Sequence, residues 1–158
     1  MAQYKDMDRR FTKQKTIATR VSQWFFAWAP VFVWMIIIFI LSSRQRLTVS
    51  HEYVLNFIFF KTLHMVEYGT LFLLCVRASN MSGKVGIWEV YKRAFIITIL
   101  YAISDELHQT FVPTREGSLR DVIIDGIGAS IIWYFLSIQL PKAPKKLKRW
   151  ASDLGFTS

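Results

Sequence analysis

YAISDELHQTFVPTREGSLRDVIIDGIG, residues 101–128, decides the fold, because it places charged residues inside two otherwise apolar segments. The stretch begins in an apolar run that holds Asp105 and Glu106, and it crosses a short polar turn. It then enters a second apolar run through Asp121 and Asp125. A charged side chain within a bilayer costs about 2.5–3.5 kcal/mol on insertion scales. These carboxylates are therefore candidates for functional residues.

The composition predicts a membrane protein. Of the 158 residues 53% are hydrophobic and 20% are charged, and the apolar residues gather in runs close to the length of about 20 residues that crosses a bilayer core. We expect one all-α membrane domain, residues 22–141, built as a bundle of four transmembrane helices. The predicted spans are residues 22–41, 61–76 with 56–60 as an extension, 94–111 and 121–140.

The net charge of +9 comes largely from two basic tails, residues 1–21 and 142–158. Basic residues that flank membrane spans are typical of cytoplasmic ends, so both termini are predicted to be cytoplasmic. The basic residues do not form the patch with groove-reading or aromatic residues that nucleic-acid binding requires. The expected partner is the lipid bilayer, and no nucleic acid is expected.

Two connections are less clear from the sequence. Residues 50–60 mix polar and aromatic side chains, and fit either the outer part of the second span or a short helix at the membrane interface. Residues 77–93 contain four basic residues with several Ser, Asn and Gly residues, and are predicted to form a loop on the basic side.

With this topology the polar residues of all four spans fall at one depth. Spans one and three end on the outer side, and spans two and four begin there, so their outer halves meet in a shared layer. Asp105 and Gln109 lie on one helix face, at i and i+4, whereas Glu106 is offset toward another neighbour. On the fourth span Asp121 and Asp125 share a stripe with Gly128, and a glycine there would allow a close helix approach.

The polar residues of this layer include possible general acids, possible general bases and basic side chains that could bind an anion. Buried carboxylates need a cation or a shared proton, and the expected partners are Lys61, His64 and Arg115. No strong zinc spacing such as H-E-x-x-H is present, so no metal site is predicted and no cofactor is assigned. The candidate acid/base residues are Glu67, Asp105, Glu106, His64 and Asp125. The candidate ligand-binding residues are Lys61, Tyr68, Gln109, Arg115, Ser118, Asp121, Ser42 and Ser43.

Two motifs carry a family resemblance. In KTLHMVEYG, residues 61–69, and in AISDELHQTFVPTREGSLRDVIIDGIGA, residues 102–129, the chain resembles the VanZ-like family of bacterial membrane proteins. The most specific part is D-E-x-x-Q-x-F-x-P-x-R, from Asp105 to Arg115. The resemblance implies a small helical bundle in the bacterial plasma membrane. The family is named after a protein that confers low-level teicoplanin resistance, and the resemblance supplies no catalytic assignment.

The leading hypothesis is an outward-facing polar cavity that acts on or binds a cell-envelope component: an envelope lipid, a wall precursor or a glycopeptide. In one form it would be an enzyme that modifies a lipid or surface glycoconjugate by acid/base chemistry, and in the other a binding protein. Two alternatives stay open. Buried carboxylates and histidine also relay protons in proton-coupled transporters, and polar side chains can hold membrane helices together in a purely structural network.

Overall fold

The computed structural model describes residues 2–44, 53–83, 85–113, 115 and 117–157, and for residues 2–18, 20 and 53 it describes the backbone alone. The described residues form helices and connections without a strand. The helices are α1 (Ala2–Ser42), α2 (Tyr53–Ser82), α3 (Ile87–Gln109), α4 (Leu119–Tyr134), η1 (Phe135–Gln139), η2 (Leu140–Lys142) and α5 (Lys145–Asp153). The all-α class predicted from the sequence is confirmed.

Three helical segments are long and apolar enough to cross a membrane: Val21–Ser42, Val54–Ser82 and Leu119–Lys142. They expose many large apolar side chains, among them Phe26, Ile36 and Ile58, as helices do when they face lipid. The fourth helix of the bundle, α3, has 23 residues. Its charged residues gather near its two ends: Glu89, Lys92 and Arg93 at the beginning, and Asp105 and Glu106 at the end.

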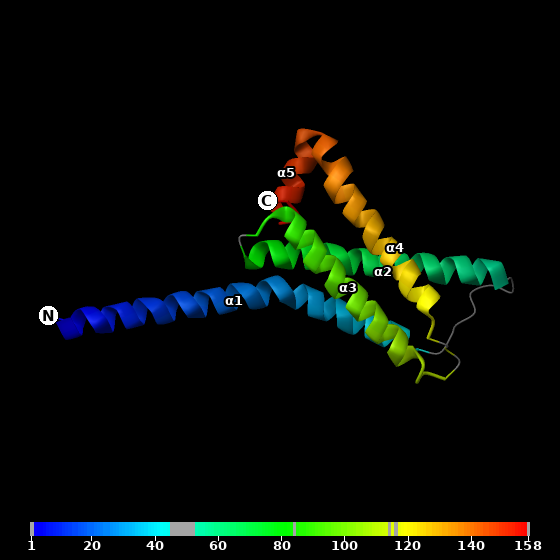
Figure 1. Cartoon of the computed structure of the whole chain (residues 1–158), viewed down its shortest axis with the longest axis horizontal. Coiled ribbons are helices and arrows are strands. Elements are labelled where there is room, and N and C mark those ends of the chain that lie inside the picture. The colour runs from blue at the N-terminus through cyan, green and yellow to red at the C-terminus, as the bar shows by residue number, and fades with distance from the viewer. Residues whose placement is uncertain (1, 45–52, 84, 114, 116, 158) are drawn as a thin grey trace.

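Helix α1 is continuous over 41 residues, which corresponds to about 60 Å at 1.5 Å per residue. This exceeds a bilayer core, and its N-terminal half extends beyond the other helices (Figure 1). The segment expected as a basic tail is therefore a helical extension of the first span. Pro30 lies inside α1, a position that membrane helices tolerate when other groups satisfy the freed carbonyl.

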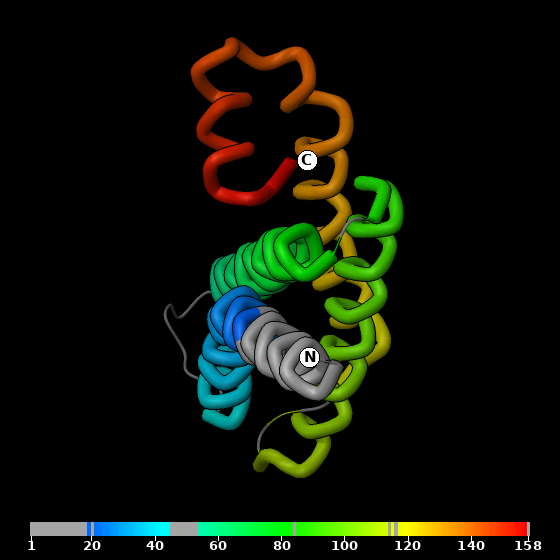
Figure 2. The backbone as a smooth tube through the Cα atoms, turned by 90° about the vertical axis from the view of Figure 1, so that its left-hand side faces the viewer, coloured from blue at the N-terminus to red at the C-terminus, as the bar shows by residue number. Residues whose placement is uncertain are grey.

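Helix α2 is the centre of the bundle, because it packs against α1, α3 and α4. Figure 2 shows α2 nearly end-on, between α1 on one side and α4 on the other. The tightest contact is with α4. A Cβ atom on Gly128 would lie 2.3 Å from the carbonyl oxygen of Met65, so only a glycine permits this approach. The close packing expected from Gly128 is present.

The bounds of α2 settle one open question and correct one prediction. Residues 53–60 belong to the same helix as the second span, whereas residues 50–52 lie outside the described residues. The predicted loop over residues 77–93 is wrong, since only residues 83–86 separate α2 from α3. Two polar side chains at the end of α2 are bonded to backbone carbonyls: Ser82 donates to that of Ala78, and Asn80 donates to that of Gly155.

The chain after α4 folds back toward the end of α2. The segment η1 is a π-helical turn and η2 a 3-10 turn, and α5 then returns so that the C-terminus lies near the α2–α3 connection (Figure 1). The bond from Asn80 Nδ2 to the Gly155 carbonyl, 3.1 Å long, joins the two parts. Residues 142–158, expected as a tail, thus include a helix with its own packing.

The apolar core occupies the half of the bundle nearest the α2–α3 connection. Phe72 of α2 stacks on Trp133 of α4 with ring centroids 6.2 Å apart, and Phe95 of α3 lies 5.4 Å from the same indole. Leu71, Cys75 and other apolar side chains around them are fully buried. Polar side chains are buried in the other half, where α1 and α3 end and α4 begins.

Candidate functional site

All four long helices contribute buried polar side chains to one region, which we call the polar cluster. Most of these side chains are nearly inaccessible: Asp125 is 1% exposed, Asp105 3% and Glu67 6%. Helices α1 and α3 bring residues from their last turns, α4 from its first two turns, and α2 from near its middle. The cluster consists of Ser42, Lys61, His64, Glu67, Tyr68, Asp105, Glu106, Gln109, Asp121 and Asp125.

Asp105 is the best-bonded carboxylate of the cluster. Its Oδ1 accepts a hydrogen bond of 2.6 Å from the Ser42 hydroxyl. Its Oδ2 accepts from the Tyr68 hydroxyl at 3.2 Å and from Gln109 Nε2 at 2.9 Å. Three donors from α1, α2 and α3 thus meet on one side chain. Such a carboxylate connects helices, because without it the buried donors of Tyr68 and Gln109 would lose their acceptor.

Lys61 and Asp121 form an ion pair between α2 and α4. Lys61 Nζ lies 2.6 Å from Asp121 Oδ2, and the two side chains are 15% and 13% exposed. The ring of Phe57 lies beside this pair, 5.7 Å from Lys61 Nζ and 5.4 Å from the guanidinium carbon of Arg120. Because cations are attracted to aromatic faces, Phe57 helps to hold two cations near Asp121.

His64 lies between two carboxylates. Its Nδ1 is 3.6 Å from Asp125 Oδ1 and 3.9 Å from Glu67 Oε2. Both distances are beyond a hydrogen bond of good geometry. An imidazole beside two buried carboxylates is nevertheless a set of groups that acid/base chemistry can use, because hydrogen bonds of this kind are often long when no ligand is bound.

Glu106 faces the connection to α4 and not Asp105, as its offset in the sequence predicts. Its Oε2 accepts a 2.8 Å hydrogen bond from the backbone N–H of Ser118. The Ser118 hydroxyl accepts from the N–H of Arg120 at the beginning of α4, so its observed role is to cap that helix. Gly117 makes this contact possible, because a Cβ there would lie 2.3 Å from the Glu106 carbonyl oxygen.

Arg115 ties the connection between α3 and α4 to the end of α1. Its guanidinium donates to the carbonyls of Arg44 and Leu41, at 3.0 and 3.5 Å, and to Gln109 Oε1 at 3.3 Å. The Ser43 hydroxyl lies 3.1 Å from His108 Nε2, at an exposed position. Arg115 reaches the cluster through Gln109, whereas Ser43 lies at its edge.

Several buried polar atoms of the cluster make no hydrogen bond with any described residue. They are His64 Nδ1, Glu106 Oε1, Asp121 Oδ1 and both carboxylate oxygens of Asp125. Buried polar atoms nearly always have a partner in protein or water. The cluster therefore combines a bonded half around Asp105 with an open half around Asp125. Across the described ranges no group of three His, Cys, Asp or Glu side chains is arranged to hold a metal ion.

Two side chains that contact the polar cluster are not among the candidates named from the sequence. The indole Nε1 of Trp34 donates to the Glu67 carbonyl at 2.9 Å, and Phe57 flanks Lys61 as described above. The sequence does indicate a contact for Trp34, because the N–H group of a tryptophan within a span needs a hydrogen-bond acceptor. Phe57 lies one helical turn before Lys61, at i and i+4, and this spacing predicts that the two side chains are neighbours on the helix surface.

Fold and site together define an all-α membrane protein with an acidic polar cluster between its helices. Comparison with known families gives a more specific assignment. The family model described as VanZ/LLP1 matches residues 11–140, and the chain belongs to this VanZ-like family, as its motifs suggested. The match extends well beyond residues 61–69 and 102–129, the motifs that carried the resemblance. No curated protein and no solved structure matches the chain.

Proposed function

We propose that the polar cluster is a binding and acid/base site for a component of the bacterial cell envelope, open to the outer side of the plasma membrane. The observation that carries the proposal is the unfilled hydrogen-bonding capacity of Asp125, beside His64 and Glu67. The outward orientation is supported by the basic residues of α5 and of the N-terminal extension, since such residues favour the cytoplasmic side.

The open atoms specify the chemistry of the ligand. Four of them are carboxylate oxygens and the fifth is an imidazole nitrogen. Ionised carboxylates only accept hydrogen bonds, so the matching group supplies donors, as the hydroxyls of a sugar or polyol headgroup do. Wall precursors, glycolipids and glycopeptides such as teicoplanin all carry such groups, and they are the ligand classes we propose.

In the enzyme form of this proposal, His64 is the general base that takes the proton of a ligand hydroxyl, and Asp125, in its protonated form, is the general acid that gives a proton to the leaving oxygen. Glu67 sets the charge of His64. In the binding form the same atoms hold the hydroxyl without reacting, and the protein alters the affinity of the cell surface for a glycopeptide. The two forms share one site and differ in whether the ligand is chemically changed.

The test is a mass-spectrometric comparison of envelope lipids and wall precursors from cells with the protein, without it, and with the Asp125→Asn variant. The proposal predicts a species that changes with the wild-type protein and not with Asp125→Asn. In the binding form, the species co-purifies with the protein without a change in mass. Asp153→Asn in α5 is the matched control, because it removes a carboxylate outside the cluster. Equal envelope profiles for wild type and Asp125→Asn, together with equal co-purification of envelope species by the two proteins, would contradict the proposal.

A proton-coupled transporter is the second candidate, favoured by the buried His64 and carboxylates. The other half of the bundle argues against it, because the residues buried beyond Glu67 on α2 are Leu71, Phe72, Cys75 and Val76. A proton path should continue through polar groups there. Sustained pH-driven flux in proteoliposomes that Asp125→Asn abolishes would reverse this ranking.

A further inference from the structure

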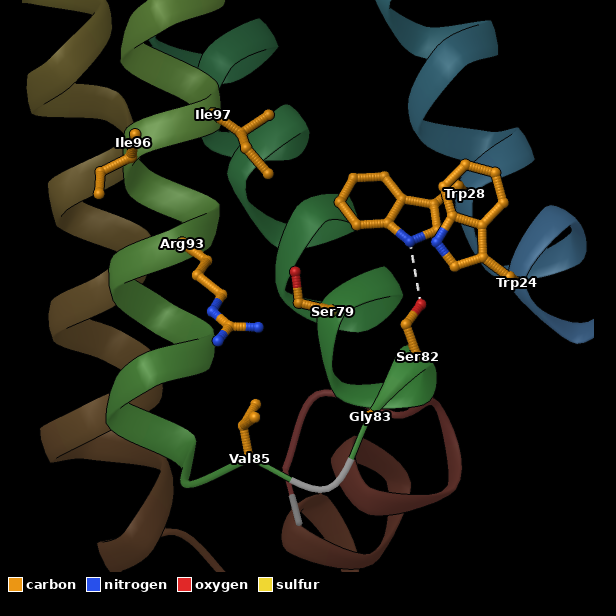
Figure 3. A pocket seen from close by; sticks show the side chains of 9 residues that line it. All are labelled: Trp24, Trp28, Ser79, Ser82, Gly83, Val85, Arg93, Ile96 and Ile97. Carbon is orange, nitrogen blue, oxygen red and sulfur yellow. Dashed lines mark hydrogen bonds between the residues drawn. The ribbon is translucent and has the colours of Figure 1, made fainter. Parts of the chain in front are cut away.

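A pocket lies at the other end of the bundle, where α1, α2 and α3 approach the α2–α3 connection. Its volume is about 370 Å³, within the range of about 300–1,000 Å³ that small-molecule sites occupy. Figure 3 shows Arg93 extending from α3 toward Ser79 of α2, across from the indoles of Trp24 and Trp28. Ile96 and Ile97 form its apolar wall. The pocket thus joins one cation and one hydroxyl to an apolar surface.

This pocket is separate from the polar cluster. Arg93 precedes Asp105 by twelve residues in α3, which places the two about 18 Å apart along the helix. Trp24 precedes Ser42 by eighteen residues in α1, or about 27 Å. The two sites therefore lie near opposite membrane interfaces, and a ligand of one does not reach the other.

Arg93 takes no part in the hydrogen bonds and ion pairs among the residues that the structure describes. Its guanidinium has no hydrogen bond or ion pair with any residue that the structure describes, whereas the neighbouring acid, Glu89, is paired with Lys92. Ser79 likewise has no hydrogen-bond partner among the described side chains. A guanidinium is a planar donor group that suits phosphate oxygens, and it is always charged. An arginine facing a pocket with a free hydroxyl opposite fits an anion with several acceptor oxygens.

The tryptophan and isoleucine side chains that line the rest of the pocket are suited to contact with a lipid. Trp24 stacks on Trp28 with ring centroids 6.0 Å apart, and Trp28 Nε1 is fixed by a 2.9 Å hydrogen bond to Ser82. Trp24 is nonetheless 47% exposed. Tryptophan is enriched at the membrane–water interface, where phosphate groups and the first carbons of acyl chains lie. Indoles and isoleucines can pack against such chains while Arg93 holds the phosphate.

Helix α5 adds independent evidence that this end contacts anionic lipid. Its lysines and Arg149 are exposed, and so are Leu147 and Trp150. A helix with basic residues and exposed apolar residues is typical of segments that lie at a membrane surface. The following residues dock on α2 through the bond from Asn80 to Gly155, close to the pocket.

From these observations we propose that the pocket binds an anionic phospholipid of the adjacent leaflet, with Arg93 and Ser79 on the phosphate and Trp24, Trp28, Ile96 and Ile97 along the acyl chains. The test uses the full chain purified in detergent and native mass spectrometry after addition of phosphatidylglycerol or phosphatidylcholine at equal concentration. We expect phosphatidylglycerol to be retained at least about tenfold more strongly, and Arg93→Gln to remove most of this preference, since a charge-assisted bond is lost. Lys92→Gln is the matched control, because it removes an equal charge from a side chain outside the pocket.

A second measurement tests whether the acyl chains contact the apolar wall of the pocket. Phosphatidylglycerol with brominated acyl chains should quench tryptophan fluorescence in the wild type, and less in Trp24→Leu. Equal lipid retention by Arg93→Gln and Lys92→Gln would overturn the proposal, and so would equal retention of the two lipids. Displacement of the lipid by millimolar inorganic phosphate alone would also overturn it, because the pocket would then be a site for a soluble anion.

Discussion

Asp125 Oδ1 lies 3.6 Å from His64 Nδ1, and neither atom makes a hydrogen bond with a described residue although both are buried. Asp105, in the same cluster, accepts hydrogen bonds from three side chains. The fold therefore uses one of these carboxylates to join helices and leaves the other open. The two carboxylates therefore differ in how much of their hydrogen-bonding capacity the described residues use, and the effect of this difference on stability can be measured.

Asp125→Asn is expected to leave the free energy of unfolding unchanged or higher. The carboxylate has no hydrogen-bond donor to lose, and a neutral amide is less costly to bury than a charge. The measurement is unfolding by sodium dodecyl sulfate in mixed micelles, followed by circular dichroism. A loss of stability as large as that of Asp105→Asn would show that Asp125 is a structural residue.

Asp105→Asn is expected to lower the free energy of unfolding by about 1–3 kcal/mol. The substitution replaces an acceptor oxygen by an amide NH₂ group, which then faces the donors of Tyr68 and Gln109 or that of Ser42. Ser42→Ala and Tyr68→Phe each remove one of the donors to Asp105 and should cost about 1 kcal/mol. Mixed-micelle unfolding of the three variants checks the order, and an Asp105→Asn protein as stable as the wild type would contradict it.

The ion pair of Lys61 and Asp121 is expected to show coupling in a double-mutant cycle. Lys61→Met and Asp121→Asn should each destabilise the protein, and together by at least about 1 kcal/mol less than their sum, because the second change removes a charge that the first left unpaired. Glu89 and Lys92 provide the control pair. They are 53% and 54% exposed, and such surface pairs are worth about 0–1 kcal/mol. Equal coupling energies for the two pairs would argue against a special role of Lys61.

Gly128→Ala is expected to force α2 and α4 apart. Its Cβ would lie 2.8 Å from the Met65 Cα as well as 2.3 Å from the carbonyl oxygen, and backbone atoms cannot move aside as a flexible side chain can. Overpacking of this kind costs about 1–3 kcal/mol. Gly83→Ala is the control, since a Cβ there meets nothing within 4 Å. The thermal unfolding midpoints of the two variants in detergent should differ by several degrees, and coincident midpoints would contradict the expectation.

Gly117→Ala is expected to disturb the connection between α3 and α4 more than the packing of the helices. The added Cβ would meet the Glu106 carbonyl at 2.3 Å, so the connection must move and the bond from the Ser118 N–H to Glu106 should break. We expect faster amide hydrogen exchange at Ser118 and Leu119, with unchanged exchange in the middle of α2. Protection equal to the wild type at these two residues would show that the connection adapts without losing the bond.

The sequence by itself determined the class of the fold and the composition of the site. Apolar runs of membrane length require helices, because backbone groups within lipid must be satisfied inside each segment. Helical periodicity then placed Gln109 beside Asp105 and put Asp121, Asp125 and Gly128 on one stripe, and the structure shows the 2.9 Å bond and the close approach that follow. The shared faces themselves lie within one helix, so 3.6 residues per turn are enough to derive them.

Only the tertiary structure decided which residues meet between helices. Lys61 pairs with Asp121, Asp105 receives donors from three helices, and Asp125 is left open. The helical length of residues 77–82 and the return of α5 to α2 were equally absent from the sequence pattern. The physical reason is that contacts between helices depend on how each helix is rotated and where it crosses its neighbour. Those quantities follow from side-chain packing over the whole bundle, and above all from the closeness that Gly128 allows between α2 and α4.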